Sequence, residues 1–140
     1  MDNQTEPVVR DSSIACNRHD YDSYVELEFL ESSRTAVDEM IHHLTNIVEQ
    51  PPQGDVIRVF VNSGSPEKPQ PIRYLMYRLR ESRAKLQPEK QTRIAATFNM
   101  MPLAQTINFF LRALRQSTIE FKAFGVGQEQ DAIDWLQSNA

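Results

Sequence analysis

Cysteine and long apolar runs are scarce in this sequence of 140 residues. Its single cysteine, Cys16, cannot form a disulfide within the chain. No apolar run approaches the roughly 20 residues that a membrane-spanning helix needs. The N-terminus is acidic and polar, whereas a signal peptide is basic and then apolar. We therefore expect a cytoplasmic protein without stable membrane insertion.

The length and charge narrow the class of protein further. A chain of 140 residues fits one domain that buries a core without disulfides or metals, and we place that domain at residues 13–140, after a flexible tail at 1–12. The net charge of −4 argues against a chain dominated by nucleic-acid binding. The charge is uneven, because residues 1–34 carry eight acids and three bases while residues 71–93 carry seven bases and two acids.

Four segments have the patterns of strands. Tyr24–Leu30 alternates apolar and acidic side chains, which indicates one buried face and a hairpin with the segment before it. Val56–Val61, apart from Arg58, and Arg93–Phe98 are apolar on both faces, so we expect central, parallel strands. Ile119–Phe124 alternates again and is expected at an edge.

Helices are expected between these strands. The caps Ser32, Ser33 and Thr35 precede an apolar stripe that ends with Val48, and Pro71 suits the first turn of a second helix. A third helix is expected over Leu103–Leu114 and a last one over Gln128–Ser138. The order is ββαβαβαβα, which predicts an α/β fold: a single-domain mixed sheet covered by helices.

The stretch after the first central strand is the main candidate site. A loop rich in Ser, Gly and Pro, including Ser63 and Ser65, leads into the basic second helix. On that helix, one flank carries Arg73, Tyr77 and Arg80, and the other carries Tyr74, Arg78 and Lys85. These residue types favour a docking surface. The alternatives are a plain surface connection and a solvated helix face.

A second candidate site lies near the expected third helix. Met100, Met101 and Phe109 would form an adaptable apolar patch, since methionine repacks easily against varied partners. The alternative is that another helix or the N-terminal tail covers these residues.

The remaining motifs predict no cofactor or metal site. We interpret His19 as a turn residue without a catalytic partner. The adjacent His42 and His43 would lie about 100° apart on a helix, as solvated side chains that cannot chelate one metal. Gly125-Val126-Gly127 is similar to a dinucleotide fingerprint but lacks its third glycine.

The element order, the Ser-Gly loop and the C-terminal strand and helix together resemble the STAS, or SpoIIAA-like, family of anti-sigma-factor antagonists. The C-terminal part of the resemblance rests on Phe121-Lys122-Ala123-Phe124 and Asp131-Ala132-Ile133-Asp134-Trp135-Leu136. It implies a SpoIIAA-like fold over residues 13–138 and a non-enzymatic regulatory role. Ser63, and less directly Ser65, match the serine that a partner kinase phosphorylates in regulatory members. Here Asn62-Ser63-Gly64 replaces the family's Asp-Ser-Ser/Thr-Gly, and an insertion with three prolines follows.

Two functional hypotheses follow. The first is a regulatory module that binds a protein partner, not nucleic acid, through the Ser63 loop and the basic helix. The second is a carrier or sensor of a small apolar or anionic ligand at Met100, Met101 and Phe109. An enzyme is not expected, because no nucleophile and base have the required spacing. A homodimer is left open.

Overall fold

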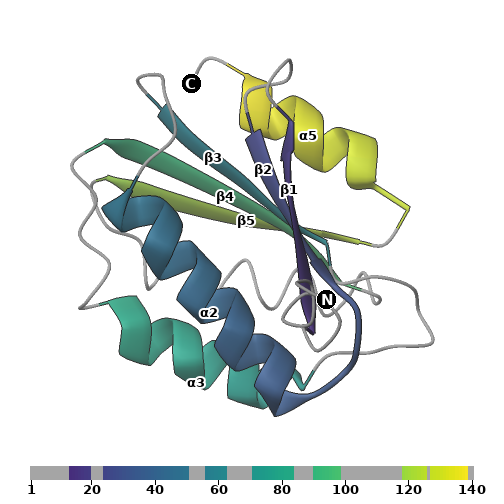
Figure 1. Ribbon diagram of the computed structural model, residues 1–140. Helices are drawn as coiled ribbons and strands as arrows, with labels where there is room; N and C mark the ends of the chain where they lie inside the picture. Colours follow the sequence, from purple (N-terminus) through teal and green to yellow (C-terminus); the bar gives the residue numbers. More distant parts are fainter. Residues whose placement is uncertain are drawn as a thin grey trace, which may run out of the picture.

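The computed structural model of the protein describes most of the expected strands and helices (Figure 1). It covers residues 13–19, 24–50, 56–62, 71–83, 90–98, 118–125 and 127–138. Its elements in chain order are β1 (Ile14–His19), β2 (Tyr24–Phe29), α2 (Arg34–Glu49), β3 (Val56–Asn62), α3 (Ile72–Arg83), β4 (Gln91–Phe98), β5 (Ile119–Gly125) and α5 (Glu129–Gln137). The helix expected over Leu103–Leu114 lies outside the described residues.

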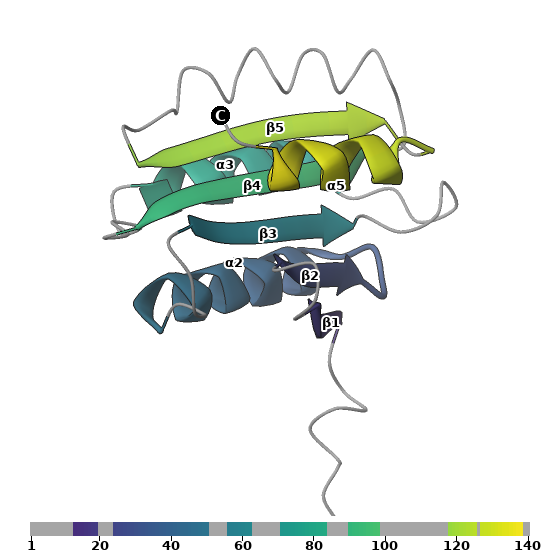
Figure 2. The same cartoon turned by 90° about the horizontal axis from the view of Figure 1, so that it is seen from above.

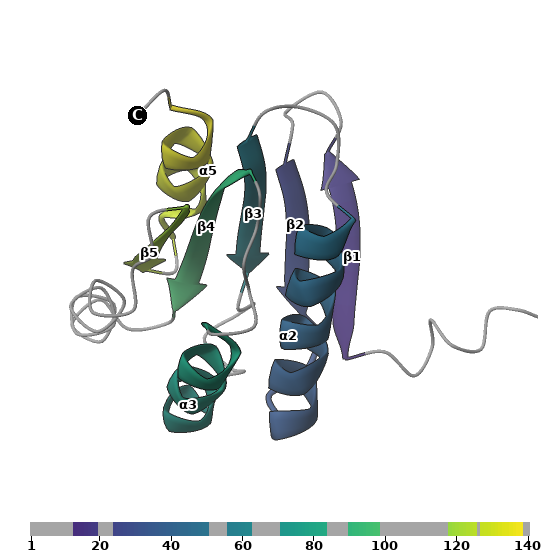
Figure 3. The same cartoon turned by 90° about the vertical axis from the view of Figure 1, so that its left-hand side faces the viewer.

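The five described strands form one mixed sheet in the order β1-β2-β3-β4-β5 (Figures 2 and 3). β1 is antiparallel to β2, and the other neighbours are parallel. The expected hairpin, the central position of Val56–Val61 and the edge position of Ile119–Phe124 are confirmed. Because the order never reverses from β2 to β5, these strands have no topological switch point, where open α/β sheets usually bind small ligands.

The helices cover the two faces of the sheet unequally. Of the described helices, α2 and α3 lie side by side on one face, and α5 lies on the other (Figures 1 and 2). The larger core cluster contains Val25, Val59 and Ile94 from the sheet and packs against α2 and α3. A smaller cluster packs Phe60 and Ala95 against Ala132 and Leu136, which are both on α5. The fold is therefore a sheet between two layers of helix.

The sequence of α2 explains both its start and its burial. The Ser33 hydroxyl accepts a hydrogen bond from the Ala36 amide at 3.0 Å, which satisfies one of the unpaired donors at a helix N-terminus. The apolar stripe then faces the sheet, and Leu44 in its middle is 1% exposed. This helix confirms the periodicity argument, and its position fixes one wall of the core.

Two arginines from the sheet hold the C-terminal end of α5. Arg58 on β3 donates from Nε to the Leu136 carbonyl at 2.8 Å. Arg93 on β4 donates from Nη1 to the carbonyl of Ser138 at 2.7 Å and to its hydroxyl at 3.0 Å. The last turn of α5 contains no basic residue. The sheet therefore supplies the cations that the terminal carbonyls of a helix favour.

Of the two arginines that contact α5, Arg93 is the more buried, with 5% of its surface exposed. Its guanidinium carbon lies 4.2 Å from the centre of the Trp135 ring. Its Nε has no hydrogen-bond partner among the described residues and lies 3.6 Å from Glu120 Oε1, which is an ion-pair distance. Arg93 thus joins β4, β5 and α5 through charge and stacking together.

Candidate functional site

The side chains of α3 point in three directions. Leu75 and Leu79 are buried against the sheet and α2. Tyr74 and Arg78 are half-buried and face α2, whereas Arg73, Tyr77 and Arg80 are exposed. The sequence predicts two equivalent basic and aromatic flanks, but the structure separates them. Of the described residues in the two flanks, Arg73, Tyr77 and Arg80 are directed to solvent, whereas Tyr74 and Arg78 contact Asp38 on α2. Lys85 lies outside the described residues.

Asp38 on α2 is the centre of that contact. Its Oδ1 accepts a hydrogen bond from the Tyr74 hydroxyl at 2.6 Å and another from Arg78 Nε at 2.9 Å. Arg78 also forms an i, i+3 ion pair with Glu81. Hydrogen bonds that involve a charged group are stronger and more directional than neutral ones. The network therefore fixes the orientation of α3 on α2.

The same network shifts two pKa values. The hydrogen bond to Asp38 is the largest effect that raises the pKa of Tyr74 above its usual value of 10.0, because ionisation would place a second negative charge beside the carboxylate. For Arg78, partial burial acts to lower the pKa, but hydrogen bonds to Glu81 and Asp38 outweigh it and raise the pKa. Both pKa shifts favour the protonated Tyr74 hydroxyl and the protonated Arg78 guanidinium, which are the forms that donate hydrogen bonds to Asp38.

The exposed surface of α3 continues onto the start of α2. The Arg34 guanidinium carbon lies 5.0 Å from the centre of the Tyr74 ring, and the rings of Tyr74 and Tyr77 are 6.4 Å apart. Tyr77 is 58% exposed, the largest value among the described large hydrophobic side chains. We call Arg34, Arg73, Tyr74, Tyr77 and Arg80 the arginine–tyrosine face.

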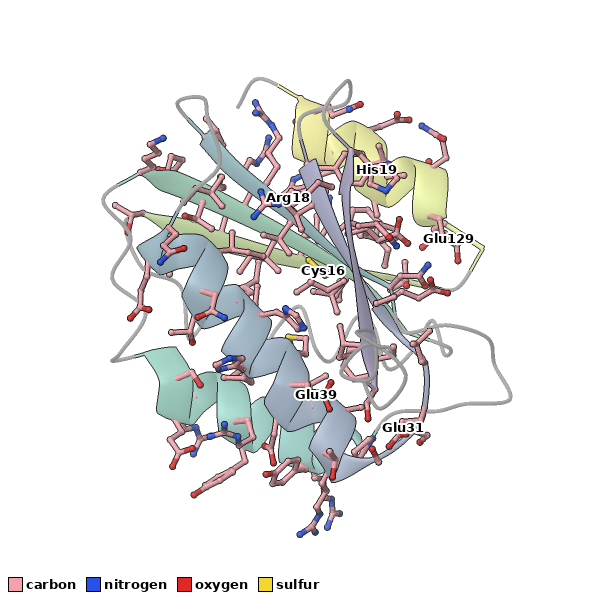
Figure 4. All side chains as sticks on the ribbon, in the orientation of Figure 1. Cys16, Arg18, His19, Glu31, Glu39 and Glu129 are labelled. Carbon is pink, nitrogen blue, oxygen red and sulfur yellow. The ribbon has the colours of Figure 1, made fainter. Side chains whose placement is uncertain are left out.

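Figure 4 shows side chains of α3 and of the start of α2 projecting away from the sheet at the lower edge of the molecule. With Arg78, the arginine–tyrosine face has four arginines, and its neighbouring acids are Asp38 and Glu81. Arginine and tyrosine combine planar hydrogen-bond donors with large apolar area, so they are enriched at interface hot spots. This arrangement is suited to binding a partner.

A second polar cluster lies on β1, β2 and β3, on the face of the sheet that also packs against α5. His19 Nε2 lies 3.1 Å from Glu26 Oε1, and Asn62 Nδ2 donates to Glu26 Oε2 at 3.2 Å. The His19 ring stacks on Tyr24 with 4.5 Å between ring centres and 15° between planes. The prediction of a turn residue is therefore wrong, since His19 is the last residue of β1 and pairs with Tyr24.

The local sequence contains the signal for this cluster, because alternation places His19 and Glu26 on one face of an antiparallel hairpin. Among the described residues, no hydroxyl or thiol hydrogen-bonds to His19, and Cys16 lies on the other face. An imidazole oriented by a carboxylate can act as a base. The described contacts of His19, to Glu26 and to Tyr24, link β1 to β2.

The two histidines of α2 differ from each other. His42 is exposed, whereas His43 is half-buried, contrary to the expectation that both are solvated. Burial, followed by the neighbouring His42, lowers the pKa of His43 below 6.5, and Glu39 opposes this. Across the described ranges, no group of three or more His, Cys, Asp or Glu side chains could hold a metal ion.

A small apolar cavity lies between the sheet and the two helices α2 and α3. Its volume is about 30 Å³, and Met40, Leu44, Met76 and Phe121 are among the residues that line it. Drug-sized ligands occupy roughly 300–1,000 Å³. The cavity therefore gives no support to a ligand site of that size. The predicted site residues Ser63, Ser65, Met100, Met101 and Phe109 lie outside the described residues, so their roles stay predictions.

Comparison with known proteins gives no match, whether with family models, curated proteins or solved structures. In the part of the chain that the structure describes, no helix is both long and apolar enough to cross a membrane. The geometry of the fold and of the arginine–tyrosine face is thus the basis of the functional argument.

Proposed function

We propose that this protein is a non-enzymatic regulatory module of the STAS type, which acts in the cytoplasm by docking a protein partner on α3 and the Ser63 loop. The observation that carries the proposal is the arginine–tyrosine face. Its inner residue Tyr74 is fixed to Asp38, while Arg73, Tyr77 and Arg80 are exposed. A surface that is rigid before binding loses less conformational entropy on association.

The fold supports the resemblance to the STAS family at a coarse level. A β-hairpin begins the sheet, and each later parallel strand adds beside the one before it. Ser63 directly follows Asn62, the last residue of β3, and Arg73 is in the first turn of α3. The proposed switch serine is therefore linked to the proposed docking helix by a short loop in sequence.

Phosphorylation of Ser63 is the proposed switch. A phosphate adds about −1.5 to −2 charges at neutral pH. It would either order the loop through Arg73 or repel an acidic partner that otherwise binds the same surface. In both cases the partner's affinity changes without any chemistry by this chain.

The ligand-carrier hypothesis places its site at Met100, Met101 and Phe109, outside the described residues, and stays a prediction. An exposed face favours a protein partner, whereas a ligand carrier needs an enclosed cavity. The described cavity, at about 30 Å³, has room for roughly one water molecule.

Affinity capture from the native cell tests the proposal. Wild type, Ser63→Asp and Arg73→Ala/Arg80→Ala are compared with Arg18→Ala/Lys122→Ala, which removes two exposed charges elsewhere on the sheet. We expect wild type and this control to capture the same partner, Arg73→Ala/Arg80→Ala to lose it, and Ser63→Asp to bind it with altered affinity. An identical partner set with unchanged affinity for all four proteins would reject the docking surface.

A further inference from the structure

The exposed residues of α3 form a stripe with a defined spacing. Arg73, Tyr77 and Arg80 are four and three residues apart, so they lie within about 60° of one another around the helix. They point away from the buried Leu75 and Leu79. At 1.5 Å rise per residue, Arg73 and Arg80 are about 10 Å apart along the helix axis, with Tyr77 between them.

The helix that carries this stripe is held in place by contacts on its other sides. The Asp38 network binds its α2 side, and the leucines bind its sheet side. The spacing between the Cα atoms of Arg73 and Arg80 is therefore set by the helix. A partner with matching charges meets a surface whose backbone is already in position.

The charge of the stripe selects the chemistry of the partner. Its two ionised side chains are both arginines, and Arg34 adds a third at the edge of the arginine–tyrosine face. Arginine forks bind carboxylates and phosphates with paired hydrogen bonds. Tyr77, at 58% exposed, contributes apolar area between them. A partner complementary to the stripe would thus present two anionic groups, one for each arginine, with an apolar group between them.

We infer that the partner of this face is an acidic amphipathic segment, with two carboxylates about 10 Å apart and an apolar side chain between them. An α-helix with acids seven residues apart presents both on one face and meets this spacing. This inference rests on the proposed function and specifies the partner's chemistry.

A protein segment fits better than a nucleic acid or an anionic membrane. Both of those present long arrays of phosphate and attract extended basic surfaces. Here the basic stripe spans two helical turns on a chain with a net charge of −4, and acids Asp38 and Glu81 lie beside it. An extended polyanion would meet the carboxylates of Asp38 and Glu81 beside the stripe, whereas a short segment can avoid them.

Synthetic helical peptides test the inference directly. The first has two glutamates seven residues apart with leucine between them. The second replaces both glutamates by glutamine. The third keeps the composition but puts the glutamates five residues apart, on different helix faces. Fluorescence anisotropy should show the first peptide binding wild type about tenfold more tightly than either control, the size expected for two exposed ion pairs.

The variants sharpen this test. Arg73→Ala/Arg80→Ala should lose the preference for the first peptide, and Arg18→Ala/Lys122→Ala should keep it. Circular dichroism confirms that each variant is folded. Equal binding of the first and third peptides would overturn the inference, as would tighter binding to polyuridylate or to phosphatidylserine vesicles.

Photo-crosslinking separates failure of the inference from failure of the proposed function. With p-benzoylphenylalanine in place of Tyr77, the segment of the native partner that lies on the stripe is captured and sequenced. An acidic amphipathic segment supports the inference. A neutral or basic segment overturns it and leaves the proposed function standing. A native partner that still binds Arg73→Ala/Arg80→Ala overturns the proposed function itself.

Discussion

At the scale of single residues, Arg93 shows how a buried cation is accommodated. It is 5% exposed, and its charge is matched by the Trp135 ring, by Ser138 and by Glu120 rather than by one bidentate carboxylate. A planar guanidinium can stack and donate at the same time, which the ammonium group of lysine cannot.

Arg93→Lys should therefore lower the free energy of unfolding by about 1–3 kcal/mol, although the charge is kept. Urea denaturation measures the loss. The matched control is Arg58→Lys, since Arg58 is half-buried and makes one hydrogen bond to α5. We expect a smaller effect there. Equal losses for the two variants would mean that stacking on Trp135 contributes nothing.

His43 leads to a prediction about pH. Its pKa is lowered in the folded protein, so between 6.5 and that lower value the unfolded chain binds more protons. Stability must then fall as the pH drops through this window, and His43 has no such effect above it. His43→Gln removes that contribution.

Denaturation at about pH 7.5 and about pH 5.5 tests this on either side of the usual histidine pKa. Wild type should lose more stability than His43→Gln across the interval. His42→Gln removes the smaller cause of the shift and keeps the burial, so its loss of stability should lie between those of wild type and His43→Gln. A wild type no more sensitive than His43→Gln would contradict the role of burial.

At the scale of elements, α2 contributes most to the larger core. Leu44 is 1% exposed in the middle of its stripe. Leu44→Ala should destabilise the protein by roughly 2–5 kcal/mol, through lost burial and the cavity left behind. Asn46→Ala on the exposed face should cost less than about 0.5 kcal/mol. A similarly small loss at Leu44 in chemical denaturation would mean that the stripe does not support the core.

The sequence predicts a helix or a strand correctly where the residues that determine it lie within the same segment. A stripe of apolar residues and a serine cap predict α2, and apolar side chains on both faces predict that β3 and β4 are central. The contacts that organise the candidate site are not local. Asp38 meets Arg78 across 40 residues, and Arg58 meets Leu136 across 78. Periodicity within a segment carries no information about such pairs, so it did not distinguish the two flanks of α3.

At the scale of the whole molecule, the sheet should be most stable at its centre. β3 and β4 have a hydrogen-bonded strand on each side and helices on both faces. The backbone amides of β3 and β4 should exchange their hydrogens most slowly, because their hydrogen bonds open only when the whole domain unfolds. Hydrogen exchange followed by mass spectrometry or NMR measures this. Better protection of β1 or β5 would contradict the central position of these two strands.

The strand order also has a consequence for the path of folding. Each strand pairs with its predecessor in the chain, so the sheet can grow from β1 to β5 by closing one crossover at a time. The contact of α5 with β3 spans 78 residues, and α5 also packs on β4 and β5, so we expect this helix to dock after those strands have paired. We expect Leu136→Ala, which opens a fully buried position on α5, to accelerate unfolding and leave the folding rate nearly unchanged. Stopped-flow measurements of both rates would show whether this helix closes over a sheet that has already formed, and a slower folding rate would place its docking in the nucleus.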